Sequence, residues 1–208
     1  MAKPSFDPQI YKRLPGLVLG FHGCDEAVGM KLLSGGSHHL KKSTNAYDWL
    51  GDGVYFWEND PQRAWEFAEE SVKKKHLTKG NITKPFVIGA VIDLGFCLNL
   101  LDRIALNELS DAYKSLESFS KKVGGVLPKN DGENFGARFL DRAVIETLHR
   151  ERDDLNQQYP GEFPPYESVR SAFREGGSLY DNSGFQDKNH IQIAIRNLAC
   201  IKGYFRPL

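Results

Sequence analysis

The stretch Gly51-Asp52-Gly53-Val54-Tyr55-Phe56-Trp57 is the most informative part of this sequence for both the fold and the site. Its β-branched and aromatic residues, which follow two glycines, predict a short strand over Val54–Trp57. Asp60 and Pro61 come shortly afterwards and are typical of a helix start, so we expect a helix that runs to about Lys75. The stretch therefore predicts a strand with an aromatic residue close to a helix N-terminus.

A second strand end lies earlier in the chain, where the apolar run Leu17–Phe21 leads into His22-Gly23. Glycine lets a ligand approach the backbone closely, and an imidazole and a phenol supply polar groups and a stacking face. If the two strand ends lie side by side, they form a slot for a flat, polar ring. Taken alone, His22 also fits a hydrogen-bonded strand-end histidine, and Tyr55 fits a core aromatic.

Apolar periodicity predicts the remaining elements. They are a short helix from Asp25 to Leu33, a strand over Pro85–Leu94, helices over about 102–120 and 135–155, and strands over His190–Arg196 and Cys200–Phe205. This uneven mixture favours an α+β fold, with two small packed β-sheets and surrounding helices. We expect one domain over residues 1–208, in which 1–15 form an irregular lead-in. No Gly-x-Gly-x-x-Gly motif opens a helix after a strand, which disfavours a Rossmann fold.

Composition narrows the classes of function. The chain has 27 basic and 27 acidic residues, so it lacks a general attraction for the phosphate backbone of nucleic acids. Three cysteines without close spacing argue against a disulfide framework and a zinc site, and we expect no metal. We find neither a signal-peptide pattern nor an apolar run near the roughly 20 residues of a membrane span. We therefore expect a cytoplasmic protein that does not enter a membrane.

The two motifs, His22-Gly23 and Gly53–Phe56, together resemble the NAD-binding signature of the ADP-ribosyltransferase superfamily. The similarity is to its diphtheria-toxin-like and poly(ADP-ribose) polymerase-like branch, which is marked by His, Tyr and Glu. The resemblance implies that NAD is the substrate. It also implies that His22 hydrogen-bonds the adenosine-side ribose and that the Gly23 backbone binds the nicotinamide amide. On the same basis, Tyr55 is expected to stack on the nicotinamide ring, with Phe56 packed behind it.

The resemblance extends to the helix after the second strand. Many relatives supply a second aromatic residue from this helix, and Trp65 and Phe67 bracket the matching place. One of them is expected to close the sandwich around the nicotinamide ring. Arg63 stands where the polymerase-like branch has a small polar residue, a departure that changes how the amide is bound.

Three further residues are candidate NAD contacts. The polar loop between the two signature strands passes over the dinucleotide in the family, so Asn45 and Tyr47 are expected at the adenosine or diphosphate end. The alternative is that Tyr47 only pins this loop to the body. Arg170 precedes the late strand and is a candidate bidentate donor to the pyrophosphate, although surface arginines are common.

Gln192 departs from the family pattern, because the spacing places it where relatives carry the catalytic Glu. Alternation over His190–Arg196 puts Gln192 on the polar face and the isoleucines on the core face. Gln keeps a hydrogen bond to the ribose 2′-hydroxyl, but it carries no charge and cannot act as a base. Polymer synthesis is therefore not expected. Glu58 and Glu175 are the acids that would substitute, unless they are ordinary solvated residues and Gln192 is a surface glutamine.

The resemblance implies an NAD-dependent mono-ADP-ribosyltransferase, a glycosyltransferase that modifies a protein or nucleic acid and releases nicotinamide. Gln192, Tyr55 and His22 would be its catalytic residues. The alternatives are an NAD glycohydrolase, a non-catalytic NAD or ADP-ribose sensor, and an RNA 2′-phosphotransferase, which the neutral composition disfavours. Small transferases of this kind often act as toxins, so a neutralising partner protein is a further expectation.

Overall fold

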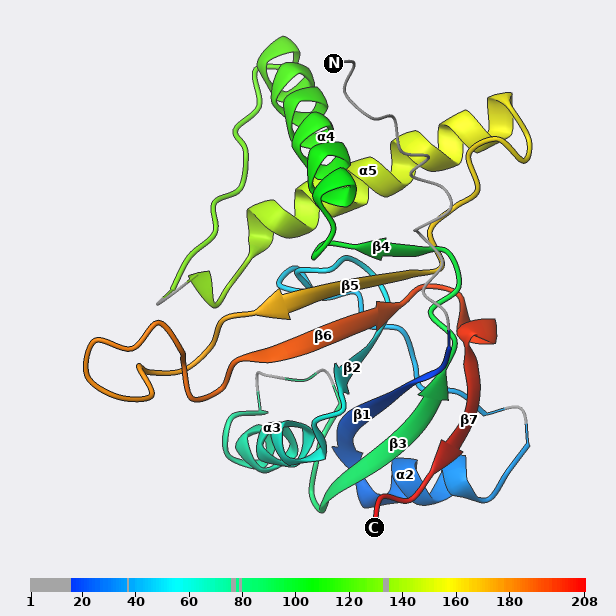
Figure 1. Cartoon of the computed structure of the whole chain (residues 1–208), viewed down its shortest axis with the longest axis vertical. Helices are drawn as coiled ribbons and strands as arrows, with labels where there is room; N and C mark the ends of the chain where they lie inside the picture. Colours follow the sequence, from blue (N-terminus) through cyan, green and yellow to red (C-terminus); the bar gives the residue numbers. More distant parts are fainter. Residues whose placement is uncertain (1–15, 37, 76–77, 79, 133–134) are drawn as a thin grey trace, which may run out of the picture.

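The computed structural model of this chain describes residues 16–36, 38–75, 78, 80–132 and 135–208, so the expected lead-in over 1–15 lies outside the described residues. Figure 1 shows the arrangement of its helices and strands. In chain order they are β1 (Val18–Asp25), α2 (Glu26–Leu33), β2 (Val54–Glu58), α3 (Pro61–Lys73), β3 (Pro85–Ile92), β4 (Cys97–Asn99), α4 (Arg103–Lys122), α5 (Phe139–Gln158), β5 (Ser168–Phe173), β6 (His190–Ile195) and β7 (Ile201–Phe205).

The mixed α and β content that the sequence predicts is confirmed, but the expectation of two separate sheets is wrong for the described residues. The strands form one seven-stranded sheet in the order β4-β5-β6-β2-β1-β3-β7. Its two halves meet at a short ladder between β1 and β2, which contains only the pairs Gly20↔Glu58 and Phe21↔Trp57. In Figure 1, β5 and β6 run in a clearly different direction from β1 and β3. The expected two sheets are therefore two halves of one sheet, joined at the β1–β2 seam.

Gly20 makes this joint sterically feasible. A Cβ atom at this position would lie 2.8 Å from the Phe56 Cβ and 2.6 Å from the Ile92 Cδ1. Contacts this close do not occur between real side chains, so a glycine is needed where the two halves of the sheet meet.

Helix caps agree with the sequence predictions. The Asp25 carboxylate accepts a hydrogen bond from Ala27 N at the start of α2, and the Asp60 carboxylate accepts one from Arg63 N at the start of α3. Each cap satisfies a backbone N–H that has no partner within its helix. Helix α5 has no such side-chain cap, and it begins at Phe139, later than the sequence pattern predicts.

Helices α3, α4 and α5 cover one face of the sheet in two groups, whereas Leu32 of α2 packs with Phe56 and Ile88 on the other face. Side chains of β4, β5, α4 and α5 form one apolar cluster that includes Leu98, Ile145 and Val169, and Tyr55 packs against it. A smaller cluster of Phe21, Trp57 and Ala64 lies under α3. Because Tyr55 and Trp57 share one face of β2, the two clusters lie on the same side of the sheet. The candidate site lies between them. None of the helices that the structure describes is long and apolar enough to cross a membrane.

Candidate functional site

The three strands that carry the signature residues are neighbours in the sheet, in the order β6-β2-β1. Tyr55 pairs with Ala194 of β6, and Trp57 pairs with Gln192. On the other side of β2, the ladder to β1 ends at the pair Phe21↔Trp57, next to His22. Segments far apart in the sequence therefore bring His22, Tyr55 and Gln192 to adjacent strands.

Beyond the last residue pair of the β1–β2 ladder, β1 contacts β2 through the side chain of His22 and not through its backbone. Its Nδ1 lies 2.7 Å from the carbonyl oxygen of Tyr55, and its ring packs edge-on against Phe56 at 5.9 Å between centroids. A carbonyl oxygen only accepts, so Nδ1 carries the proton and Nε2 of the neutral ring keeps a lone pair. Burial lowers the pKa of His22, which favours this neutral form. His22 thus offers a fixed hydrogen-bond acceptor, suited to a ribose hydroxyl.

Gly23 lies directly beneath the first turns of α3. A Cβ atom there would lie 2.2 Å from the carbonyl oxygen of Ala64, so only glycine allows the helix to approach this closely. The β1–β2 ladder does not extend to Gly23, which instead pairs with Val87 of β3 on its other side.

The Tyr55 hydroxyl is engaged within the protein. It accepts a hydrogen bond from Leu50 N at 3.0 Å and donates one to the Gly51 carbonyl oxygen at 2.8 Å. Burial raises the pKa of Tyr55 well above its usual value, so the phenol stays protonated. The hydroxyl thus fixes the preceding loop, and the half-buried ring is the part of Tyr55 that remains for stacking. Phe56 is fully buried on the opposite face of β2.

Gln192 is oriented by Trp49, which the sequence analysis did not place at the site. The Trp49 indole Nε1–H donates to Gln192 Oε1 at 2.5 Å. Trp49 in turn packs against Phe173 at 5.0 Å, and the Arg138 guanidinium lies over both rings. The Gln192 side chain is therefore held with its carbonyl oxygen toward the indole, and that oxygen retains a second lone pair.

The two aromatic candidates on α3 differ in position. Phe67 faces the sheet and lies 5.0 Å from the Trp57 ring, whereas Trp65 is 39% exposed. The loop candidates lie further out: the Asn45 amide donates to the Ser43 hydroxyl at 2.8 Å, and Tyr47 is exposed. The structure thus brings Phe67 toward the core of the site, and it keeps Trp65, Asn45 and Tyr47 at the periphery.

Arg170 is paired inside the protein. Its Nε and Nη2 donate to the two carboxylate oxygens of Glu58 at 2.6 and 2.9 Å, and its Nη1 donates to Asn99 at 3.3 Å. The hydrogen bonds to Glu58 raise the pKa of Arg170, and both side chains are largely buried. Bidentate pairing of this kind uses the two donors that a pyrophosphate would require.

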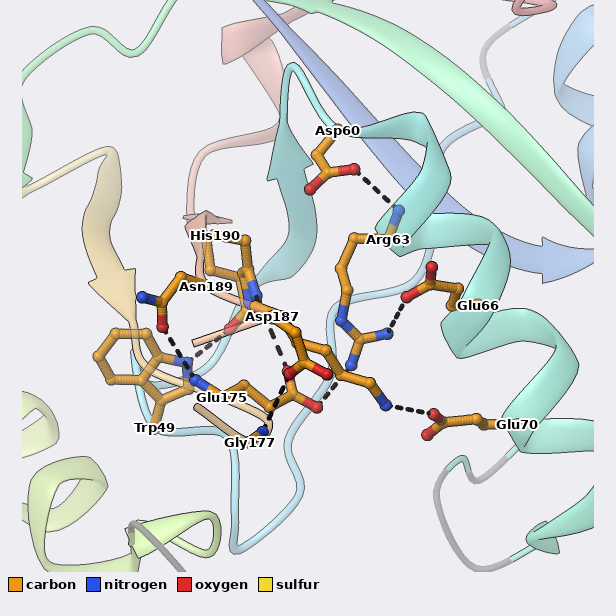
Figure 2. Close-up of polar contacts among 12 residues, drawn as sticks. Trp49, Asp60, Arg63, Glu66, Glu70, Glu175, Gly177, Asp187, Asn189 and His190 are labelled. Atoms are coloured by element: carbon orange, nitrogen blue, oxygen red, sulfur yellow. Dashed lines mark hydrogen bonds and ion pairs between the residues drawn. The ribbon is translucent and has the colours of Figure 1, made fainter. Parts of the chain in front are cut away.

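A buried polar cluster that sequence reasoning largely missed adjoins Gln192 (Figure 2). Arg63 Nη2 donates to the Glu175 carboxylate at 2.6 Å, and the other Glu175 oxygen lies 3.8 Å from His190 Nδ1. Strand alternation was the signal that could have found part of it. His190 lies two residues before Gln192, and Trp57 lies two residues after Tyr55, each on the same face as its neighbour.

Two hollows elsewhere do not coincide with this site. Their volumes are about 500 and 620 Å³, and both are lined by Phe96, Pro164 and Glu167, beyond the far end of β6. Within the described part of the chain, no group of three or more His, Cys, Asp or Glu side chains is arranged to hold a metal ion.

No protein-family model, curated protein or solved structure matches this chain. Its function must therefore be inferred from the residues of the site and their geometry.

Proposed function

We propose that this protein is an NAD-dependent mono-ADP-ribosyltransferase that transfers ADP-ribose to a macromolecule and releases nicotinamide. The observation that carries the proposal is the meeting of three signature strands at the β1–β2 seam. There His22, Tyr55 and Gln192 lie on three neighbouring strands, and the His22 imidazole is hydrogen-bonded to the Tyr55 carbonyl oxygen.

The proposed reaction breaks the bond between the nicotinamide nitrogen and ribose C1′. Nicotinamide leaves as a neutral molecule, and the ribose becomes cationic. His22 Nε2 accepts a hydrogen bond from the adenosine-side ribose, and Gln192 Oε1 accepts one from the 2′-hydroxyl of the reacting ribose while Trp49 holds the same oxygen. A nucleophile of the acceptor then bonds to C1′ and loses its proton to solvent, because Gln192 cannot take it.

A non-catalytic NAD sensor is the second candidate, and one observation favours it. The acids that would substitute for the missing carboxylate are both ion-paired, Glu58 with Arg170 and Glu175 with Arg63. A paired carboxylate gives less stabilisation to a developing cation than an unpaired one.

The two candidates are distinguished with NAD labelled on its adenine, by following nicotinamide release, label attached to macromolecules and NAD affinity together. Under the proposal, the wild type releases nicotinamide and labels a target. His22→Ala should lower the rate about five- to tenfold, the effect of one lost hydrogen bond to the substrate. His38→Ala, at an exposed histidine, is the matched control. NAD binding without release would indicate the sensor, release without labelling a glycohydrolase, and no NAD binding would refute both candidates.

A further inference from the structure

The buried cluster beside Gln192 contains three side chains with unpartnered polar atoms. Trp57 is 5% exposed, Arg63 5% and His190 9%. Trp57 Nε1, Arg63 Nε and Nη1, and His190 Nε2 have no hydrogen-bond partner among the described residues. Unpartnered buried groups are costly, so their concentration in one place requires an explanation.

These atoms lie around one region of the sheet face. The Trp57 and His190 rings are 6.0 Å apart between centroids, and the Arg63 guanidinium carbon lies 5.8 Å from the Trp57 ring centre. Gln192 stands between Trp57 and Ser171 on the neighbouring strands. The cluster is therefore part of the same surface as the proposed catalytic side chain.

The hydrogen-bonding character of the cluster is fixed by the bonds that its members already make. His190 Nδ1 lies 2.8 Å from the Lys188 carbonyl oxygen, so it carries the proton and Nε2 is left as an acceptor in the neutral ring. Burial lowers the pKa of His190, which favours that neutral ring. The Trp57 indole and the Arg63 guanidinium, whose Nη1 lies 3.8 Å from a Glu66 carboxylate oxygen, are donors only. A ligand group that fits must therefore accept hydrogen bonds on one side and donate one on the other, as a primary carboxamide does.

Charge also limits what the cluster can bind. Figure 2 shows several carboxylates around Arg63, and they belong to Asp60, Glu66, Glu70, Glu175 and Asp187. The basic groups beside them are Arg63, which pairs with Glu175 and Glu66, and Lys188, which pairs with Glu70. This surplus of acids disfavours a phosphate or carboxylate and suits a neutral or cationic group. The nicotinamide ring of NAD is cationic and carries a primary carboxamide.

We infer that Trp57, Arg63 and His190 form the subsite that binds the carboxamide of nicotinamide. The inference rests on the proposed function and assigns the amide to side chains of this cluster. The Trp57 indole and Arg63 donate to the amide oxygen, and the amide nitrogen donates to His190 Nε2. Glu175 stays near Arg63 and neutralises it, which selects the amide over the acid.

The loop between β5 and β6 forms the outer side of the subsite. Glu175 and Lys188, with 31% and 34% of their side chains exposed, connect it to α3 through Arg63 and Glu70. The Lys188–Glu70 ion pair is exposed enough to contribute little to stability. A ligand reaches the buried atoms when this loop moves outward while Glu175 keeps its pairing with the buried Arg63.

The test follows the indole N–H signals in a ¹⁵N–¹H spectrum of the whole chain. The sequence contains three tryptophans, so three signals are expected, and Trp57→Phe identifies one of them. Nicotinamide should move the Trp57 signal downfield and leave that of the exposed Trp65 in place. Trp57→Phe should weaken nicotinamide binding about fivefold, the effect of one hydrogen bond, and the matched control Trp65→Phe should not. Nicotinic acid, which lacks the amide donor, should bind more weakly than nicotinamide.

The outcomes separate this inference from the proposed function. If NAD binds, releases nicotinamide and moves other signals but leaves the Trp57 signal unchanged, the subsite assignment is wrong and the proposed function is unaffected. Equal affinities for nicotinamide and nicotinic acid would also overturn the assignment. If NAD neither binds nor releases nicotinamide, the proposed function itself fails.

Discussion

Under the proposed function, replacing Gln192 with Glu should accelerate the release of nicotinamide from NAD. In the proposed reaction, the substitution adds a negative charge next to the ribose that becomes cationic when nicotinamide leaves. For unit charges about 4 Å apart at an effective dielectric constant near 20, the interaction is on the order of 4 kcal/mol, which corresponds to nearly a thousandfold in rate. Gln192 is half-buried, and its oxygen already faces the Trp49 indole, so Glu fits the same place and keeps that hydrogen bond.

The assay is the first-order rate of nicotinamide release at saturating NAD. Because partial exposure screens the new charge, we expect an increase of about a hundredfold, below the limit given above. Gln157→Glu, at an exposed position near the end of α5, is the matched control for a change in net charge. An unchanged rate in Gln192→Glu, or the same increase in both variants, would refute the placement of Gln192 beside the reacting ribose.

Three further predictions concern the stability of the folded protein. Arg170→Ala should lower the free energy of unfolding by about 3 kcal/mol in urea denaturation, because it leaves the largely buried Glu58 without its partner. A loss below about 1 kcal/mol would mean that this ion pair contributes no more than a solvent-exposed pair does. Gly23→Ala should lower stability by about 1–3 kcal/mol and weaken NAD binding, since its Cβ would collide with Ala64; normal melting and NAD affinity would contradict the close approach of α3. His149 is buried and its pKa is lowered to about 3, so the unfolded state takes up the proton first and stability falls as the pH drops from about 6.5 toward 3. His149→Phe should reduce that slope by up to about 1.4 kcal/mol per pH unit, and an unchanged slope would contradict it.

Local chemistry explains the parts of the fold that the sequence predicts. Asp25 and Asp60 cap their helices through hydrogen bonds to backbone groups two or three residues away, which a local pattern contains in full. Strand β6 follows from its alternation, and β2 from its aromatic residues. Strands β4 and β5 were missed because β4 has only three residues and β5 contains Ser168, Arg170 and Ser171.

Long-range pairing explains what the sequence left open at the site. Trp49 and Gln192 are 143 residues apart, and no local pattern indicates that the indole donates to the amide. Arg170 was predicted at the pyrophosphate because an arginine near the site suits a phosphate, yet its partner Glu58 lies on β2, with β6 in between. The number of sheets was also decided by pairing, through the two residue pairs that join β1 to β2.

The most direct test of the proposed NAD site is a comparison of nicotinamide release from NAD by the wild type, Tyr55→Phe and Tyr55→Ala. Tyr55→Phe keeps the ring that is proposed to stack on nicotinamide and loses only the hydrogen bonds to Leu50 and Gly51. We predict that Tyr55→Phe retains most of the release rate, whereas a folded Tyr55→Ala loses it about a hundredfold. Equal rates in all three proteins, with NAD still bound by the wild type, would contradict the account.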